Sequence, residues 1–203
     1  MIYQFENYYL YMTKIFFDIE TYSPNTFQRP KFNEKIITIA HKAENSDISI
    51  LKEWEIGEKE VLMRFIEVIK QTDWPNLVGH NILRFDIPVL IYRSLENDLG
   101  SLHELMTLYL ESFPIDTIQC LLPTNNLYFK GLGLKDCAHY MGIEMKGCPS
   151  SEISKHYEQG NYDEIIRHNI EDVLTTEKLH NHLLNSSFYP FKDLQMKRQN
   201  NAN

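Results

Sequence analysis

Two acidic residues in the first apolar run have the spacing of a metal-binding pair. Asp18 and Glu20 lie two apart in KIFFDIET, and because alternate side chains of a strand share a face, both carboxylates point the same way. Their apolar neighbours indicate a central, covered strand, where adjacent carboxylates repel each other and lose hydration. A bound cation is the simplest remedy. The alternative is that the strand has already reached solvent at Asp18.

A third carboxylate belongs to a strand–loop–helix segment. Asp86 lies in VGHNILRFDIPVL, where a short predicted strand leads into a loop and Asp86 opens a helix with Pro88 in its first turn. Aspartate is a favoured helix cap and proline suits the first turn, so capping alone is an alternative role for Asp86.

The last predicted helix adds a histidine and a fourth carboxylate. His168 and Asp172 are four residues apart, which places them one above the other on one helix face. The alternative is an ordinary surface pair with solvated partners. The other ionisable residues singled out in this helix are expected to be solvated or at the surface: Asp163, Glu171, His180 and His182.

The combination of these segments indicates one chemistry. Carboxylates come in the order strand, strand-to-helix loop and final helix. Hard divalent cations take oxygen ligands, and Mg²⁺ keeps several of its waters. Two such metals, about 3.5–4 Å apart, can clamp the attacking and leaving oxygens of a phosphodiester. A nearby imidazole can take the proton from the attacking water or orient it.

The periodicity of apolar residues predicts the elements that must position these side chains. Strands are predicted over residues 14–21, 35–41 and 47–54, as a meander, and over 76–79. Helices are predicted over residues 58–71, 86–96, 102–110, 115–121, 134–141 and 162–184. This order indicates a mixed sheet flanked by helices, without a linker that divides it.

Composition bounds the class of protein. The chain has 203 residues, 43% of them hydrophobic, and a net charge of −8. It is expected to form one main domain over 14–185, with an extension at 1–13 and a polar tail at 186–203. Three cysteines without a CxxC motif indicate reduced thiols in a cytoplasmic protein. No apolar run approaches the ~18 residues of a membrane helix, so no membrane partner is expected.

Three motifs resemble those of the DEDD superfamily of DnaQ-like 3′→5′ exonucleases. They are FDIET, GHNILRFDIPVL and RHNIEDV, in the order and context of that superfamily. The closest resemblance is to the proofreading domain of family-B DNA polymerases and to the stand-alone predicted exonucleases related to it. It covers roughly Lys14 to Leu184. The resemblance implies an α/β, ribonuclease H-like fold, whose mixed five-stranded sheet begins with the three-stranded meander.

The same resemblance implies roles for individual residues and two divalent cations, Mg²⁺ or Mn²⁺, as cofactors. Asp18 would bridge both metals, Glu20 and Asp172 would complete the protein ligands of the first, and Asp86 would serve the second. The positions that match the family's substrate-binding positions are Thr21, Asn81 and Phe85.

One departure from the family concerns His168. The polymerase-like branch has a tyrosine four residues before the last aspartate, whereas the histidine branch usually spaces its histidine five before it. This chain has His168 four before Asp172. His168 therefore holds the tyrosine's place with an imidazole, which can act as the catalytic base.

The expected activity is hydrolysis of the terminal phosphodiester of single-stranded nucleic acid, with DNA favoured over RNA, to release nucleoside 5′-monophosphates. The alternative is a catalytically weak nuclease-like module that binds strand ends or a protein partner. An endonuclease or strand-transfer enzyme on the same fold is a third possibility. The acidic net charge argues against tight, processive binding of long strands.

Other polar residues have weaker indications. His80 could contact a phosphate or only make its loop polar, and Asp116 is predicted to cap a helix. Three lysines flank the GLG turn, where they are expected to be solvated unless they approach phosphates: Lys130, Lys135 and Lys146.

Overall fold

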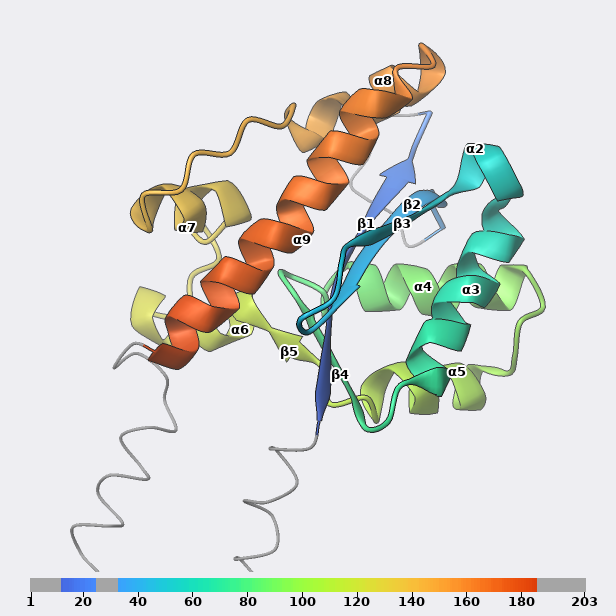
Figure 1. The fold of residues 1–203 in the computed structure, drawn as a ribbon, viewed down its shortest axis with the longest axis horizontal. Helices are drawn as coiled ribbons and strands as arrows, with labels where there is room; N and C mark the ends of the chain where they lie inside the picture. The colour runs from blue at the N-terminus through green and yellow to red at the C-terminus, as the bar shows by residue number, and fades with distance from the viewer. Residues whose placement is uncertain (1–11, 25–32, 186–203) are drawn as a thin grey trace, which may run out of the picture.

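A mixed five-stranded sheet forms the centre of the computed structural model, which describes residues 12–24 and 33–185 (Figure 1). The strand order is β3-β2-β1-β4-β5. The central strand β1 (Thr13–Tyr22) pairs antiparallel with β2 (Lys35–Ala43), which pairs antiparallel with β3 (Ser49–Lys52). On its other side β1 pairs parallel with β4 (Pro75–Gly79), and β4 with β5 (Ile115–Asp116). The predicted α/β fold, sheet and meander are confirmed.

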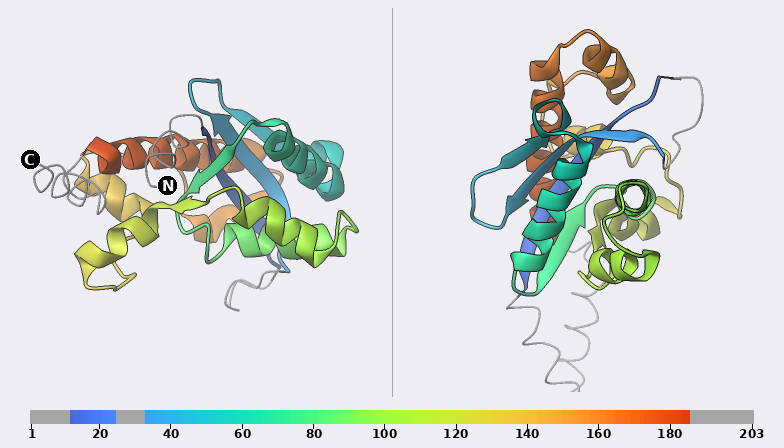
Figure 2. Two further views of the ribbon diagram at one scale, coloured as in Figure 1. Left: turned by 90° about the horizontal axis from the view of Figure 1, so that it is seen from below. Right: turned by 90° about the vertical axis from the view of Figure 1, so that its right-hand side faces the viewer.

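Helices cover both faces of this sheet (Figures 1 and 2). The long helix α9 (Tyr162–Asn185) runs along one face, and α3 (Glu58–Gln71) and α4 (Asp86–Glu96) lie on the other. The remaining helices are α2 (Glu53–Ile56), α5 (Leu102–Leu110), α6 (Thr117–Leu121), α7 (Leu134–Tyr140) and α8 (Ile153–Glu158), with 3-10 turns η1 (Leu122–Asn125) and η2 (Ser150–Glu152). None of the helices within the described residues is long and apolar enough to span a bilayer.

The two faces of β1 differ in what they bury. Ile15, Phe17 and Ile19 belong to the largest apolar core, which includes residues of α3 and α4. Phe16 points to the other face and packs in a smaller cluster with Val173 of α9. Since side chains alternate along a strand, Asp18 and Glu20 share the face of Phe16 and α9. The prediction of a central strand covered on both faces is thereby confirmed.

Two predicted elements have the wrong type over part of their length. The predicted helix over residues 115–121 begins with β5, because Ile115 pairs with Val78 and the Asp116 side chain then caps α6. The predicted strand over residues 47–54 is confined to β3, and the chain turns into α2 at Glu53. Short apolar runs do not distinguish strand from helix by periodicity.

The segments predicted as an extension and a tail lie almost entirely outside the described residues. Strand β1 begins at Thr13, one residue before the predicted start, and α9 ends at Asn185, one residue beyond the predicted end.

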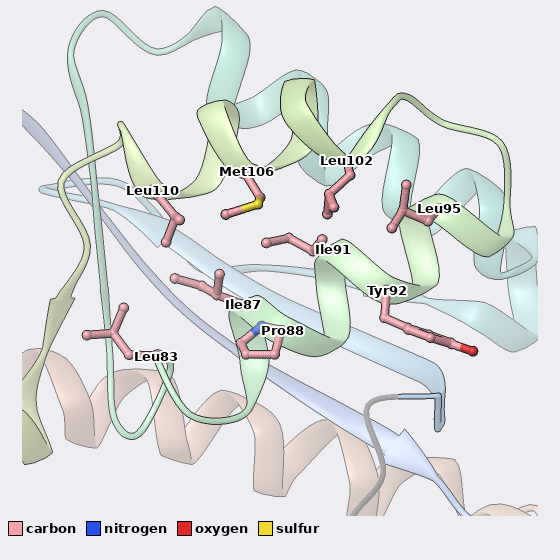
Figure 3. Close-up of a pocket in the computed structure, with 9 residues that line it drawn as sticks. All are labelled: Leu83, Ile87, Pro88, Ile91, Tyr92, Leu95, Leu102, Met106 and Leu110. Carbon is pink, nitrogen blue, oxygen red and sulfur yellow. The ribbon is translucent and has the colours of Figure 1, made fainter.

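An apolar pocket of about 340 Å³ lies between α4 and α5 (Figure 3). Leucine, isoleucine, methionine, proline and tyrosine side chains line it, and none of its lining residues carries a charge at neutral pH. The pocket is therefore separate from the ionisable residues that follow.

Candidate active site

Strand β1 carries Asp18 and Glu20 into the interior between the sheet and α9. Glu20 is buried and Asp18 is half-buried. Their register partners on β2 are the small residues Ala40 and Thr38. The pairing of β1 with β4 ends at Phe16, so both carboxylates lie beyond the end of β4, next to the loop that leaves it.

That loop brings Asp86 to β1. It starts at Gly79, where an added Cβ would lie 2.1 Å from Ile82 Cγ2 and 3.2 Å from the Phe17 carbonyl oxygen. Only glycine permits this close approach. At the other end of the loop, Asp86 is buried and its Oδ1 accepts a hydrogen bond from the Ile19 backbone N–H at 3.2 Å. The carboxylate therefore reaches the backbone between Asp18 and Glu20. The alternative role as a helix cap is wrong, because the N-cap residue of α4 is Phe85 and no side chain caps this helix.

Helix α9 places the fourth carboxylate over the same strand. Its residues 165, 168, 169, 172 and 173 follow helical spacing and face the sheet. Asn169 donates from Nδ2 to Asp18 Oδ2 at 2.7 Å. Asp172, one turn after His168, has a buried Oδ1 without a hydrogen-bond partner among the described residues.

His168 lies between carboxylates of both elements. Its Nε2 is 3.3 Å from Glu20 Oε1 and 3.7 Å from Asp172 Oδ2. Ser150 Oγ is also 3.3 Å from this nitrogen. The imidazole is buried, so the alternative of a solvated surface pair is wrong. All five residues predicted to be catalytic come together: Asp18, Glu20, Asp86, His168 and Asp172.

Burial and mutual repulsion raise the pKa values of the four carboxyl groups. Burial, then Asp86, Asp172 and Glu20, hold the pKa of Asp18 well above its usual range, against the Asn169 hydrogen bond. Burial, Asp172 and Asp86 do the same to the pKa of Glu20. Burial raises the pKa of Asp86 and of Asp172 to about 7 each. Burial lowers the pKa of His168, opposed by Glu171. The site thus has a marked deficit of positive charge.

Comparison with known protein families shows which family the chain belongs to. The family model described as RNase_H superfamily matches residues 15–184, most of the chain. The chain belongs to the RNase_H superfamily. The resemblance predicted from the three motifs is thereby confirmed at the level of the superfamily.

Two polymerases are similar to this superfamily member over parts of their length. The chain is 36% identical over 78 residues to DNA polymerase 2 of Aeropyrum pernix, a match that spans 38% of this chain and 10% of the polymerase. The solved family B DNA polymerase of Pyrobaculum calidifontis superposes with a TM-score of 0.66 at 19% identity, over 85% of this chain and 24% of the polymerase. The chain therefore corresponds to a small part of each, and the structural match shows the shared fold.

The residues present fit divalent metal ions. Glu20, His168 and Asp172 each offer one ligand atom, and these atoms lie within 4.8 Å of one another. Among the ion pairs of the described residues, Glu20 and Asp172 have no lysine or arginine partner. Carboxylate oxygens are the donors that Mg²⁺ and Mn²⁺ prefer, and a bound cation would offset the repulsion that raises the pKa values of these groups.

Several residues of the site have no role in the predictions from sequence. Asn169 shares the helix face of His168 and Asp172, so helical spacing could have found it. Ser150 is 18 residues before His168 in the chain, and no local pattern points to it. Glu171, predicted to be solvated, instead accepts hydrogen bonds from the backbone N–H groups of Lys146 and Gly147 at 2.8 and 2.6 Å.

The segment that contains Lys146 and Gly147, here named the strap, crosses the His168 ring at Gly147. An added Cβ there would lie 2.8 Å from His168 Nδ1 and 2.9 Å from Glu171 Oε2. The strap therefore covers the Nδ1 edge of the ring, and only Nε2 faces the carboxylates. Nδ1 has no hydrogen-bond partner among the described residues.

The other polar residues differ in outcome. His80 is occupied within the protein, with Nδ1 2.7 Å from Thr117 Oγ1 and Nε2 2.8 Å from the Leu132 carbonyl oxygen. Asp116 caps α6 as predicted, and its carboxylate also accepts from the backbone N–H groups of Asn81 and Leu83. It thereby holds the loop that presents Asp86. The prediction that His180 lies at the surface is wrong, because this residue is buried. His182 is exposed, as predicted.

The three residues predicted to bind substrate differ in their hydrogen bonds and in their burial. Thr21 follows the irregular pairing after Glu20 and donates from Oγ1 to Glu34 Oε2 at 2.8 Å. Asn81 has a left-handed backbone, and its buried Oδ1 lacks a hydrogen-bond partner among the described residues. Phe85 is half-buried against the main core. Their contact with a substrate remains a prediction.

Proposed function

We propose that this protein is a metal-dependent 3′→5′ exonuclease that removes nucleoside 5′-monophosphates from single-stranded nucleic acid, with DNA favoured over RNA. The observation that carries the proposal is the convergence of four carboxylates and one imidazole from β1, α4 and α9. Burial raises the pKa values of these carboxyl groups, and no lysine or arginine pairs with Glu20 or Asp172 among the described residues. Membership of the RNase_H superfamily and the similarity to two DNA polymerases support a nuclease.

In this proposal the four carboxylates would hold two divalent cations. By the family resemblance, Asp18 would serve both cations, Glu20 and Asp172 the first and Asp86 the second, and the burial of Asp18 among the other three carboxylates supports this assignment. Bound cations supply charge stabilisation of the phosphodiester and a lowered pKa of the attacking water. The carboxylates need no cationic side chain of the protein, because the cations offset their repulsion.

His168 is proposed as the group that accepts the proton of the attacking water. Its one accessible nitrogen, Nε2, faces the carboxylates, and burial keeps the ring neutral by lowering its pKa. A neutral imidazole can accept a proton, whereas a protonated one cannot. Asn169 positions Asp18 through its amide hydrogen bond. The Ser150 hydroxyl, 3.3 Å from His168 Nε2, must turn away from this nitrogen before it accepts a proton.

A labelled-substrate assay tests the function. Single-stranded DNA and RNA, labelled at the 5′ end, are incubated with the protein and Mg²⁺ or Mn²⁺, and the products are separated by length. The expected result is a ladder that shortens one nucleotide at a time from the 3′ end, with DNA degraded faster. Asp172→Asn is the matched control, because it keeps the shape of the site. Internal cuts, or shortening from the other end, would contradict the proposal.

Calorimetry with Mn²⁺ separates this enzyme from a weak, nuclease-like binding module. The intact cluster is expected to bind Mn²⁺ and Asp18→Asn to bind it more weakly. A protein without Mn²⁺ binding and without a ladder would be the binding module instead.

A further inference from the structure

An exposed aromatic loop projects between η1 and α7. Its residues Leu127, Tyr128 and Phe129, here named the aromatic tip, are 69%, 69% and 38% exposed. Asn126 and Leu127 both have left-handed backbones, with φ of 50° and 62°. The side-chain Nδ2 of Asn125 donates hydrogen bonds to the backbone carbonyl oxygens of Tyr128 and Lys130. The loop is therefore built to hold large apolar side chains in water, an arrangement that is unfavourable without a ligand.

The aromatic tip is attached to the loop that presents Asp86. The Arg84 guanidinium lies 4.0 Å from the centre of the Phe129 ring, a cation–π contact. A second tie follows the tip, where His80 Nε2 donates to the carbonyl oxygen of the buried Leu132 at 2.8 Å. Both anchors, His80 and Arg84, belong to the segment that ends at Asp86. In Figure 1 the elements on either side of the tip, α6 and α7, lie beside α9.

The charge around the tip differs from that of the whole chain. The net charge of the protein is −8, which repels a polyanion. Around the tip the exposed cations Arg84, Lys130 and Lys135 outnumber the exposed acid Asp136. Exposed aromatic rings with cations between them suit single-stranded nucleic acid, because any base can stack on a ring and a phosphate can meet the cation.

We propose that the aromatic tip is a stacking surface for bases upstream of the strand's 3′ end, with Arg84 and Lys130 directed to the phosphates between them. The inference rests on the proposed exonuclease function, since the carboxylate site fixes where the strand ends. It assigns the grip on the strand to ring faces and two cations near the site, in place of a long basic groove. A strand too short to reach the tip is hydrolysed without its help.

Binding measurements test the tip apart from catalysis. Fluorescence anisotropy measures the affinity of wild type and variants, in Mn²⁺, for a ten-nucleotide DNA strand. Phosphorothioate linkages at its 3′ end slow hydrolysis. The double variant Tyr128→Ser/Phe129→Ser is expected to bind about 10- to 100-fold more weakly than wild type. The control, Phe113→Ser, removes a ring that is 53% exposed in the turn before β5, whereas the tip follows the other end of this edge strand through α6 and η1. It is expected to leave the affinity unchanged.

A strand that keeps its 3′-terminal base but lacks the upstream bases shows whether stacking is responsible. Wild type and double variant are expected to bind this strand equally, and to hydrolyse a dinucleotide at equal rates. Equal binding of the full strand by both proteins overturns the inference, as does an undiminished difference on the strand without upstream bases. If no strand is hydrolysed by wild type, the exonuclease proposal fails, while the anisotropy difference still decides whether the tip binds bases.

Discussion

His168 and His180 are two buried histidines on α9 that face the same strand and have different surroundings. His168 lies against Glu20, with Asp172 and Ser150 nearby. His180 packs edge-on against the ring of Phe16, with ring centroids 5.5 Å apart. Neither nitrogen of His180 makes a hydrogen bond of normal geometry among the described residues. Burial lowers the pKa of both.

The difference between the two histidines lies in the residues of β1. Phe16 and Glu20 occupy the same face of the strand, four residues apart, and α9 runs along that face. The helix therefore meets an apolar residue at one end of the strand and carboxylates at the other. Burial alone does not indicate a functional histidine, so the role proposed for His168 depends on its neighbouring carboxylates. Substitutions along this face should separate a catalytic end from a packing end.

The largest effect is expected at the catalytic end, from Asp18→Asn. This change removes the carboxylate shared by both proposed cations, while the amide keeps an oxygen for the Asn169 hydrogen bond. Nuclease activity in Mg²⁺ is expected to fall by at least about 10⁴-fold, because the site loses its central charge. Circular dichroism should show an unchanged fold. Activity within tenfold of wild type would remove Asp18 from the proposed site.

His168→Ala is expected to lower activity by about 10²- to 10⁴-fold, the range for a positioned acid–base group. Activity of the wild type should fall as His168 is protonated, and since its pKa is lowered, this acid limb is expected below about pH 6.5. His168→Tyr should retain measurable activity with a flatter acid limb, because tyrosine keeps its proton to about pH 10.

Mn²⁺ calorimetry on His168→Ala distinguishes a base from a metal ligand. The atoms of Glu20, His168 and Asp172 are close enough to share a cation, so the distinction needs a measurement. For a base, the Mn²⁺ affinity of the variant stays within about threefold of wild type. A loss of tenfold or more in affinity would make Nε2 a ligand.

A smaller effect is expected on the stability of the metal-free protein. Burial raises the folded-state pKa of Asp172 to about 7 from the ordinary 3.8. The carboxyl contributes most to stability below about pH 4, and this contribution is lost as the pH rises through 7. Asparagine does not titrate. With a chelator present, the stability of Asp172→Asn relative to wild type should therefore increase between pH 5 and pH 8.

Thermal unfolding measures that gain. The difference in Tm between Asp172→Asn and wild type is expected to grow by about 3 °C or more from pH 5 to pH 8, the shift that roughly 1 kcal/mol gives in a domain of this size. Mn²⁺ at pH 8 should reverse the order by stabilising only the wild type strongly. A difference that is constant with pH would show that Asp172 is not held at a raised pKa.

The sequence predicts the acidic end of this face more fully than its neighbours. Fixed periodicities place Asp18 beside Glu20 and His168 beside Asp172, whereas the expectation that the two pairs form one site came from the combination of the motifs and from the family resemblance. Asp86 required the family resemblance, because its sequence context is equally that of a helix cap. Among the elements, the helices 58–71, 86–96 and 102–110 were predicted with the bounds that the structure has.

The contacts that escaped prediction join segments whose separation in the chain carries no periodic signal. Glu171 was predicted to be solvated because its own helix gives no other indication, yet it binds the backbone at Lys146 and Gly147 from outside that helix. His180 was assigned to the surface for the same reason, and Phe16 on β1 covers it. Strand β5 was missed because its two residues are fixed by pairing with β4, not by local pattern.

The packing end of the face gives the smallest expected effect, through His180→Leu. Leucine removes two buried ring nitrogens that make no normal hydrogen bond, and it keeps apolar contact with Phe16. Burial, with Lys14, lowers the folded-state pKa of His180, so its contribution to stability is complete above about pH 6.5 and is lost as the pH falls through the folded-state pKa. The free energy of unfolding of the variant in urea should match that of wild type at pH 7.5 to within about 1 kcal/mol. Because leucine does not titrate, the variant should become more stable relative to wild type at pH 5.5. Nuclease activity in Mg²⁺ at pH 7.5 should stay within about twofold, because the residue touches none of the proposed ligands. A tenfold loss of activity without a loss of stability would show that the catalytic region extends along α9 to His180.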